Sequence, residues 1–176
     1  VVYPFGYGLS YTTFDVETVS AGVVNSNCTS EANKLYAKVR VTNTGKFSGK
    51  EVVQVYIAKP QGKLGKPAKE LAAFEKTREL QPGESQLMIL TWEINDMASY
   101  DDLGKVKTSA YVLEAGSYDI YVGTSVRDVT KADYSYILNH DVITEQLSAK
   151  LVPTSLPKRM LADGSYEALP QSEPVD

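Results

Sequence analysis

Hydrophobic and polar residues alternate with a period of two over residues 35–42. The apolar side carries Leu35, Ala37, Val39 and Val41, and the other side carries Tyr36, Lys38, Arg40 and Thr42. A period of two is typical of a β-strand with one face on the core and one face in water. We therefore expect a half-buried strand here, with Tyr36 on its outer face.

A similar alternation follows over residues 52–57. It puts Val53, Val55 and Ile57 on one face and Tyr56 on the other, outer face. Lys59-Pro60 ends the pattern, because proline has no N–H to donate to a β-ladder. The following stretch, residues 60–67, holds two prolines and two glycines, and we expect it to be irregular and exposed.

Further strands and turns are predicted downstream. Gln81-Pro82-Gly83-Glu84 is typical of a type II turn, with glycine supplying positive φ at the third position. Residues 87–92 are apolar on both faces, which predicts a strand covered on both sides, with Trp92 in the core. Residues 111–113 and 118–122 are expected to pair as a hairpin, and residues 95–100 to form a short helical turn with Asn95 as its N-cap.

These patterns predict an all-β fold, a two-sheet antiparallel β-sandwich. From Lys150 onward the chain carries four prolines and no sustained periodicity. This part therefore predicts a partly irregular C-terminal extension or linker, residues 141–176. Its large apolar residues suggest that part of it lies along a domain; they are Leu151, Leu156, Met160, Leu161 and Leu169.

The first residues are unusually aromatic. Five rings occur within twelve residues: Tyr3, Phe5, Tyr7, Tyr11 and Phe14. A terminal segment is normally frayed, so this many rings imply a surface that covers them. We interpret residues 1–13 as a strap that docks on a preceding domain, with residues 14–140 as the sandwich. The alternative is that the rings pack on this chain's own core.

Composition narrows the function classes. The 176 residues are 43% apolar and 23% charged, with 18 basic against 22 acidic side chains and a net charge of −4. No basic stripe is present, which argues against nucleic acid as a partner. No apolar run approaches the roughly 18 residues that span a bilayer, so no membrane span is expected. Cys28 is the only cysteine and favours a reducing compartment, although a cytoplasmic and a secreted bacterial origin both stay open.

Chemistry-bearing residues do not form a recognisable site. A glycosidase holds two carboxyl groups roughly 5 to 10 Å apart. Glu70 with Glu75, and Asp101 with Asp102, are the candidate pairs, and their polar flanks predict solvated surface. His140 is the only histidine, which is too little for a zinc site. We therefore expect no catalytic residue, no metal and no cofactor in this chain.

Carbohydrate binding without catalysis is the main alternative function. Exposed aromatic rings can stack on the C–H face of a pyranose. The candidates are Tyr36, Tyr56, Tyr134 and Tyr136. The structural alternative is cross-strand tyrosine pairing, which stabilises a sheet by about 0.2 to 1 kcal/mol per pair. A spacer module of a surface protein is a third reading, but the chain shows no internal repeat.

Five motifs in order resemble one family. They are the aromatic segment Tyr3–Phe14, Val41–Gly45 with Gly49–Tyr56, Lys69–Lys76, Leu80–Ser85, and Ala115–Gly123. Together they resemble the fibronectin type III-like domain of glycoside hydrolase family 3 enzymes of the β-glucosidase type, with the aromatic segment as the connection from the second catalytic domain. Residues 124–176 match only loosely.

The resemblance implies that the β-sandwich is of the fibronectin type III or immunoglobulin-like kind. It also implies a non-catalytic accessory module that docks on the catalytic domains of the same parent chain. The parent would hydrolyse terminal β-linked sugars by a retaining two-carboxylate mechanism without a metal. In that family the nucleophilic aspartate belongs to a barrel domain, and the acid/base residue to an α/β domain or a loop near it. Nothing in this chain matches either motif. The tail also suggests a following domain, as in family members with a permuted domain order.

Overall fold

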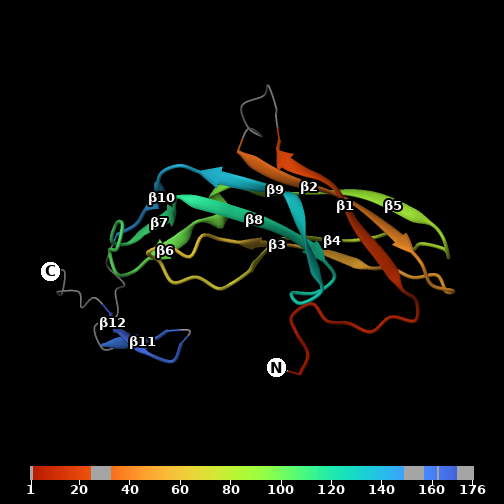
Figure 1. Ribbon diagram of the computed structural model, residues 1–176, viewed down its shortest axis with the longest axis horizontal. Coiled ribbons are helices and arrows are strands. Elements are labelled where there is room, and N and C mark those ends of the chain that lie inside the picture. Colours follow the sequence, from red (N-terminus) through yellow and green to blue (C-terminus); the bar gives the residue numbers. More distant parts are fainter. Residues whose placement is uncertain (1, 25–32, 149–156, 162, 170–176) are drawn as a thin grey trace. The chain divides into compact units, whose positions relative to one another are not determined.

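The structure is a computed structural model that describes residues 2–24, 33–148, 157–161 and 163–169 (Figure 1). Cys28, Leu151 and Leu156 lie outside these described residues. The described residues contain no α-helix, and they form two compact units. Unit 1 takes the residues up to Lys59, Pro67–Met97 and Ser117–Ile137; unit 2 takes Pro60–Lys66, Ala98–Gly116 and the described residues from Leu138 onward.

The first sheet of unit 1 has the strand order β1-β2-β5, all antiparallel (Figure 1). Its strands are β1 (Phe14–Val23), β2 (Lys34–Asn43) and β5 (Ser85–Glu93). The alternation predicted for β2 is confirmed, because its four inner apolar side chains are fully buried. On β5, Trp92 is buried as predicted.

The expectation that β5 is covered on both sides is wrong. Leu87 and Ile89 are 50% and 59% exposed. The reason is the position of β5 at the edge of its sheet, where these two residues lie opposite Arg40 and Lys38 on the outer face of β2. The long stems of the basic side chains are their cross-strand neighbours, and the described residues leave this face of β5 open.

The second sheet of unit 1 has the order β4-β3-β8-β9. Its strands are β4 (Glu70–Lys76), β3 (Val52–Ala58), β8 (Gly116–Gly123) and β9 (Val129–Leu138). The inner side chains of both sheets are buried, as in a β-sandwich, and include Val53, Val55, Ile120 and Val122. The all-β sandwich predicted from the sequence is therefore confirmed.

Tyr56 is buried, so its predicted place on an exposed outer face is wrong. Every residue from Val53 to Ile57 is buried, because β3 lies between β4 and β8 in the middle of its sheet. The Tyr56 hydroxyl donates to Gln54 Oε1 at 2.5 Å, and Gln54 Nε2 in turn donates to the carbonyl of Gly6 at 3.5 Å. The segment before β1 therefore lies against this side of β3.

Two predicted turns have different outcomes. Gly83 has φ of +80°, and the N–H of Glu84 donates to the carbonyl of Gln81 at 2.9 Å, which confirms the turn at residues 81–84. The helical turn is a 3₁₀ turn, η1 (Asn95–Met97), and the chain becomes extended again at Ser99.

Unit 2 contains a sheet of order β10-β7-β6 and a separate pair, β11 with β12. The strands are β6 (Ser99–Asp101), β7 (Ala110–Leu113), β10 (Val142–Gln146), β11 (Lys158–Met160) and β12 (Tyr166–Ala168). The C-terminal extension thus includes a short antiparallel pair in its described part. Arg159 on β11 bonds to Asp102 at 3.0 Å and to Glu167 on β12 at 2.7 Å.

The predicted hairpin of residues 111–113 with 118–122 is wrong, because β7 pairs with β6 and β10, whereas β8 pairs with β3. The connecting Glu114 is not part of an exposed turn. Its buried carboxylate accepts hydrogen bonds from the backbone N–H groups of Lys63 and Leu64 and pairs with Lys66. The expectation that residues 60–67 are exposed is therefore wrong for Leu64 and for the side chain of Lys66.

Asp101 is also buried, which corrects its assignment to solvated surface. Its carboxylate accepts from the backbone N–H groups of Lys105, Val106 and Lys107 at 2.6 to 3.0 Å. Burial alone would raise the pKa of Asp101, but these N–H groups hold it below its ordinary value. The carboxylate therefore organises the loop between β6 and β7.

A pH dependence follows for Asp101. Since its folded pKa is depressed, its contribution to stability is present above the unfolded pKa of about 4 and is lost as pH falls through the folded pKa. We expect Asp101→Asn to lower the free energy of unfolding at pH 7 by about 1–3 kcal/mol, and this loss to shrink on acidification. Urea denaturation at pH 7 and pH 3 measures both, with Asp133→Asn on the exposed side of β9 as the control. An Asp101→Asn loss that is equally large at both pH values contradicts the assignment.

Candidate functional site

The N-terminal strap, described over residues 2–13, exposes its hydrophobic side chains. Leu9 and Tyr11 are 91% and 96% exposed, and Tyr3, Phe5 and Tyr7 are exposed as well. Only Phe14, the first residue of β1, is half-buried. The rings of Tyr3 and Tyr7 lie against each other, with centroids 5.1 Å apart. The alternative that these rings pack on this chain's own core is wrong for the four rings of the strap.

The backbone of the same strap is firmly held. The carbonyl of Phe5 accepts from the N–H of Val126 at 3.0 Å, and Gly6 lies against the amide of Gln54 with φ of +81°. A side chain at Gly6 would overlap that amide, so glycine is required both by the conformation and by the close approach. The strap is thus bound to unit 1 through its main chain at Phe5 and Gly6, while its four rings are exposed.

Thr12 forms the second attachment of the strap. Its buried hydroxyl donates to Asn43 Oδ1 at 2.7 Å. Asn43 is itself fully buried, and its Nδ2 donates to the carbonyls of Phe47 and Leu80 at 2.8 and 2.9 Å. Its Oδ1 also accepts from the N–H of Gly45 at 3.0 Å. One side-chain amide therefore joins the strap to two other segments.

A groove lies between the strap and the adjoining strand ends. It has a volume of about 370 Å³, and its lining includes Tyr7, Leu9, Lys50, Glu51 and Asp128. Burial raises the pKa of Glu51, and the nearby carboxylate of Asp128 adds to the effect. The groove thus has a mixed lining, in which Lys50, Glu51 and Asp128 are charged and Tyr7 and Leu9 are apolar. Nothing in the sequence indicates that Glu51 and Asp128 meet, because they are far apart in the chain and the strand motif that contains Glu51 carries no chemical signature.

The four candidate sugar-binding tyrosines lie in different surroundings. Tyr56 is buried and cannot present a ring to a sugar. Tyr36, Tyr134 and Tyr136 are half-buried. Burial raises the pKa of Tyr134, and the neighbouring phenol groups of Tyr136 and Tyr36 add to this, so the structure brings these three together. Tyr136 also packs edge-on against the buried Tyr118, with centroids 6.1 Å apart.

The candidate carboxylate pairs do not form a catalytic arrangement. Glu70 forms an ion pair with Lys59, and Asp102 forms one with Arg159. The carboxylate of Asp101 accepts hydrogen bonds from backbone N–H groups. His140 is exposed. Among the described residues no three His, Cys, Asp or Glu side chains are grouped to hold a metal ion. In the same part of the chain no helix is long and apolar enough to span a membrane.

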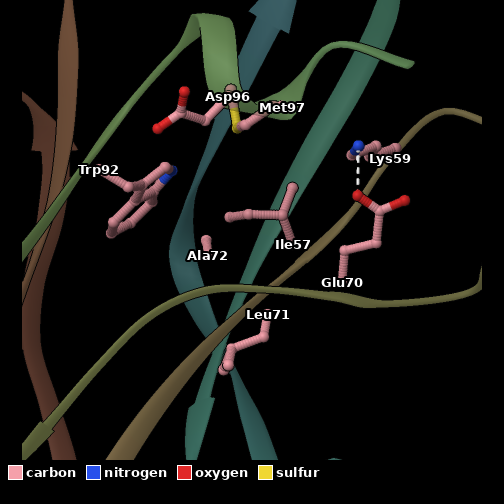
Figure 2. Close-up of a pocket in the computed structure, with 8 residues that line it drawn as sticks. All are labelled: Ile57, Lys59, Glu70, Leu71, Ala72, Trp92, Asp96 and Met97. Carbon is pink, nitrogen blue, oxygen red and sulfur yellow. Dashed lines mark ion pairs between the residues drawn. The ribbon is translucent and has the colours of Figure 1, made fainter. Parts of the chain in front are cut away.

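A smaller pocket of unit 1, of about 60 Å³, lies beside the end of β5 (Figure 2). Its apolar lining comes from Ile57, Leu71, Ala72 and Met97, and its polar lining from Trp92, Asp96 and the Lys59–Glu70 ion pair. Figure 2 shows the nitrogen of the Trp92 ring on the side that faces Asp96, Met97 and Ile57. Sequence reasoning placed Trp92 in the core but gave no indication of the pocket.

Comparison with known proteins shows what this chain is similar to. A model of the fibronectin type III-like domain matches residues 51–126. β-Glucosidase A of Butyrivibrio fibrisolvens is 58% identical over the whole of this chain, which spans 22% of that protein. A β-glucosidase of Ruminococcus albus is 42% identical over 98% of this chain, which spans 18% of that protein. The chain therefore spans about a fifth of the length of these curated relatives.

A solved structure agrees with the sequence relatives. The β-glucosidase from Paenibacillus barengoltzii matches 98% of this chain with a TM-score of 0.84 and 42% identity, and this match covers 20% of that protein. The agreement includes the strands of the sandwich and extends well beyond residues 51–126. A β-glucosidase of Bifidobacterium adolescentis, described as a glycoside hydrolase family 3 enzyme, matches 80% of this chain with a TM-score of 0.63 and 31% identity. The resemblance found in the sequence is thereby confirmed: the chain is similar to the fibronectin type III-like part of β-glucosidases of this family.

Proposed function

We propose that this chain is a non-catalytic structural module that docks on the catalytic part of its own parent enzyme through the N-terminal strap. The observation that carries the proposal is the contrast within the strap, whose main chain is bound to unit 1 while its rings are exposed. A frayed terminus would lack these anchors, and a strap that served only this domain would turn its rings inward.

The energetics favour a covering partner. Burial of one aromatic or large aliphatic side chain contributes about 1.5–3 kcal/mol to the free energy of association. The strap exposes five such side chains, one at every second position from Tyr3 to Tyr11. Grouped apolar exposure of this kind marks an interaction site rather than ordinary surface. A backbone that is already ordered also lowers the conformational entropy lost on docking.

The parent is proposed to be an enzyme of the β-glucosidase type that hydrolyses terminal β-linked sugars. This part of the proposal rests on the names of the relatives, of which the chain represents about a fifth. Carbohydrate binding by Tyr36, Tyr134 and Tyr136 is a second hypothesis, supported by their grouping, but the edge-on packing of Tyr136 on Tyr118 favours a structural role for them.

An activity assay can test whether catalysis belongs to the parent enzyme and not to this chain. We expect the 176-residue chain to leave a chromogenic β-glucoside intact. Glu70 and Asp102 are paired with cations and Asp101 is bound by backbone N–H groups, so neither candidate pair has both carboxylates available. The full-length parent should release the chromophore under the same conditions. Absorbance assays at equal molar concentration measure both, and turnover by the isolated chain would contradict the proposal.

The docking role predicts an effect that depends on context. We expect Phe5→Ala with Tyr7→Ala to leave the melting temperature of the isolated chain almost unchanged, since both rings are exposed in it. In the full-length parent the same change should lower the melting temperature by several degrees, because the rings are then buried. Differential scanning calorimetry of both proteins measures the difference. Phe47→Ala removes an equally exposed ring outside the strap and is the matched control. Equal small shifts in the parent for both variants would rule out docking through these rings.

The anchor of the strap predicts an effect within the isolated chain. Asn43→Ala removes four side-chain hydrogen bonds in a fully buried place, so we expect a loss of about 2–4 kcal/mol in the free energy of unfolding. Asn139→Ala, at an exposed position, should cost less than about 0.5 kcal/mol. Urea denaturation measures both, and similar values for the two variants would show that Asn43 does not hold the strap.

A further inference from the structure

The pocket beside Trp92 contains an unpaired hydrogen-bond donor. The indole Nε1 of Trp92 is buried, and it has no hydrogen-bond acceptor among the residues that the structure describes. A buried donor without a partner costs about 1–3 kcal/mol. Figure 2 shows this nitrogen facing the pocket, so a group that enters the pocket can accept its hydrogen bond.

An acceptor lies at the same pocket. Asp96, on the turn η1, is exposed at the rim, and its carboxylate pairs with no cation within the described ranges of the chain. Glu70, also in the lining, is already paired with Lys59. The pocket therefore offers one N–H donor and one carboxylate acceptor that other side chains do not use.

This combination selects a particular chemical group. A hydroxyl can accept from the indole N–H and donate to a carboxylate at the same time, which neither a carbonyl nor an ammonium group can do. Apart from the Lys59–Glu70 ion pair, the rest of the lining is apolar, and it favours a carbon group beside the hydroxyl. The volume of about 60 Å³ is several times the roughly 10–15 Å³ that one water molecule needs, so a group of a few heavy atoms fits.

We propose that this pocket binds the hydroxymethyl group of a hexose, with its oxygen between Trp92 Nε1 and the Asp96 carboxylate. The hydroxymethyl group consists of one methylene and one hydroxyl and is the narrowest end of the sugar. The ring then stays at the mouth of the pocket. This site is separate from the strap and from the tyrosine group, and it does not depend on docking to a catalytic domain.

The test uses the fact that Trp92 is the only tryptophan in the 176 residues. In the ¹⁵N-labelled chain its indole N–H gives a single resonance that needs no assignment. Titration with D-glucose should shift this resonance in a saturable way at millimolar concentration. D-xylose has the same ring without the hydroxymethyl group, and we expect its binding to be roughly tenfold weaker or absent.

Two variants and a control complete the experiment. Asp96→Ala removes the acceptor and should weaken glucose binding roughly tenfold. Ala72→Leu fills the pocket and should abolish the shift. Asp133→Ala, at an exposed position outside the pocket, should bind glucose as the wild-type chain does. No saturable shift with glucose, equal shifts with xylose, or an unchanged response in Asp96→Ala would each overturn the proposal and leave water as the partner of the indole.

Discussion

The side-chain amide of Asn43 uses its full hydrogen-bonding capacity at the end of β2. Its two donors go to the carbonyls of Phe47 and Leu80, and its oxygen accepts from Thr12 and Gly45. An aspartate has no donors to offer at this position, and an aliphatic residue has neither donors nor acceptors. Because the amide is fully buried, each of these bonds also prevents the cost of an unsatisfied polar group. The path of the strap, the turn after β2 and the segment before β5 are therefore fixed together.

This polar attachment explains why the strap can leave its rings outside. Strands and terminal segments are usually held by the burial of their apolar side chains, which uses up those side chains for the fold. Here Thr12, Gly6 and the carbonyl of Phe5 hold the strap through hydrogen bonds and close backbone contact. The rings of Phe5, Tyr7 and Tyr11 then add little to the stability of the isolated domain. Their apolar surface stays available for a partner.

The sequence predicted what depends on local periodicity. The inner face of β2, the turn at Gly83 and the end of β3 at Pro60 follow from residue spacing and backbone chemistry alone. The same reasoning failed where the burial of a side chain depends on the strands beside its own strand. Tyr56 and Ile89 occupy similar positions in an alternating pattern, yet Tyr56 lies in a central strand and is buried, whereas Ile89 lies in an edge strand and is exposed. The alternation within a single strand does not indicate whether that strand is central or at the edge of its sheet.

The burial of charged side chains was the second feature that the sequence did not predict. Asp101 was assigned to solvated surface, since acidic residues are seldom fully buried, and Glu114 lies in the connection of the hairpin that was expected for residues 111–122. Both are buried because local backbone N–H groups replace water around the carboxylate, with Lys66 as an added cation at Glu114. The sequence could not reveal this, because the donors are backbone groups whose direction depends on the loop conformation.

The strap and the Trp92 pocket differ in what they lack. Within the described part of the chain, the strap lacks a cover for its apolar rings, and the pocket lacks an acceptor for its buried N–H group. The strap exposes apolar rings on a backbone that is already bound to unit 1, so it is suited to a large partner such as another folded domain. The pocket contains a buried donor in a mostly apolar lining, so it calls for a small group that brings its own acceptor. A protein surface can reach the Trp92 indole only by inserting one side chain into the pocket. A sugar is too small to cover the exposed rings of the strap. The two surfaces of this domain are therefore suited to different partners, and occupation of one does not require the other.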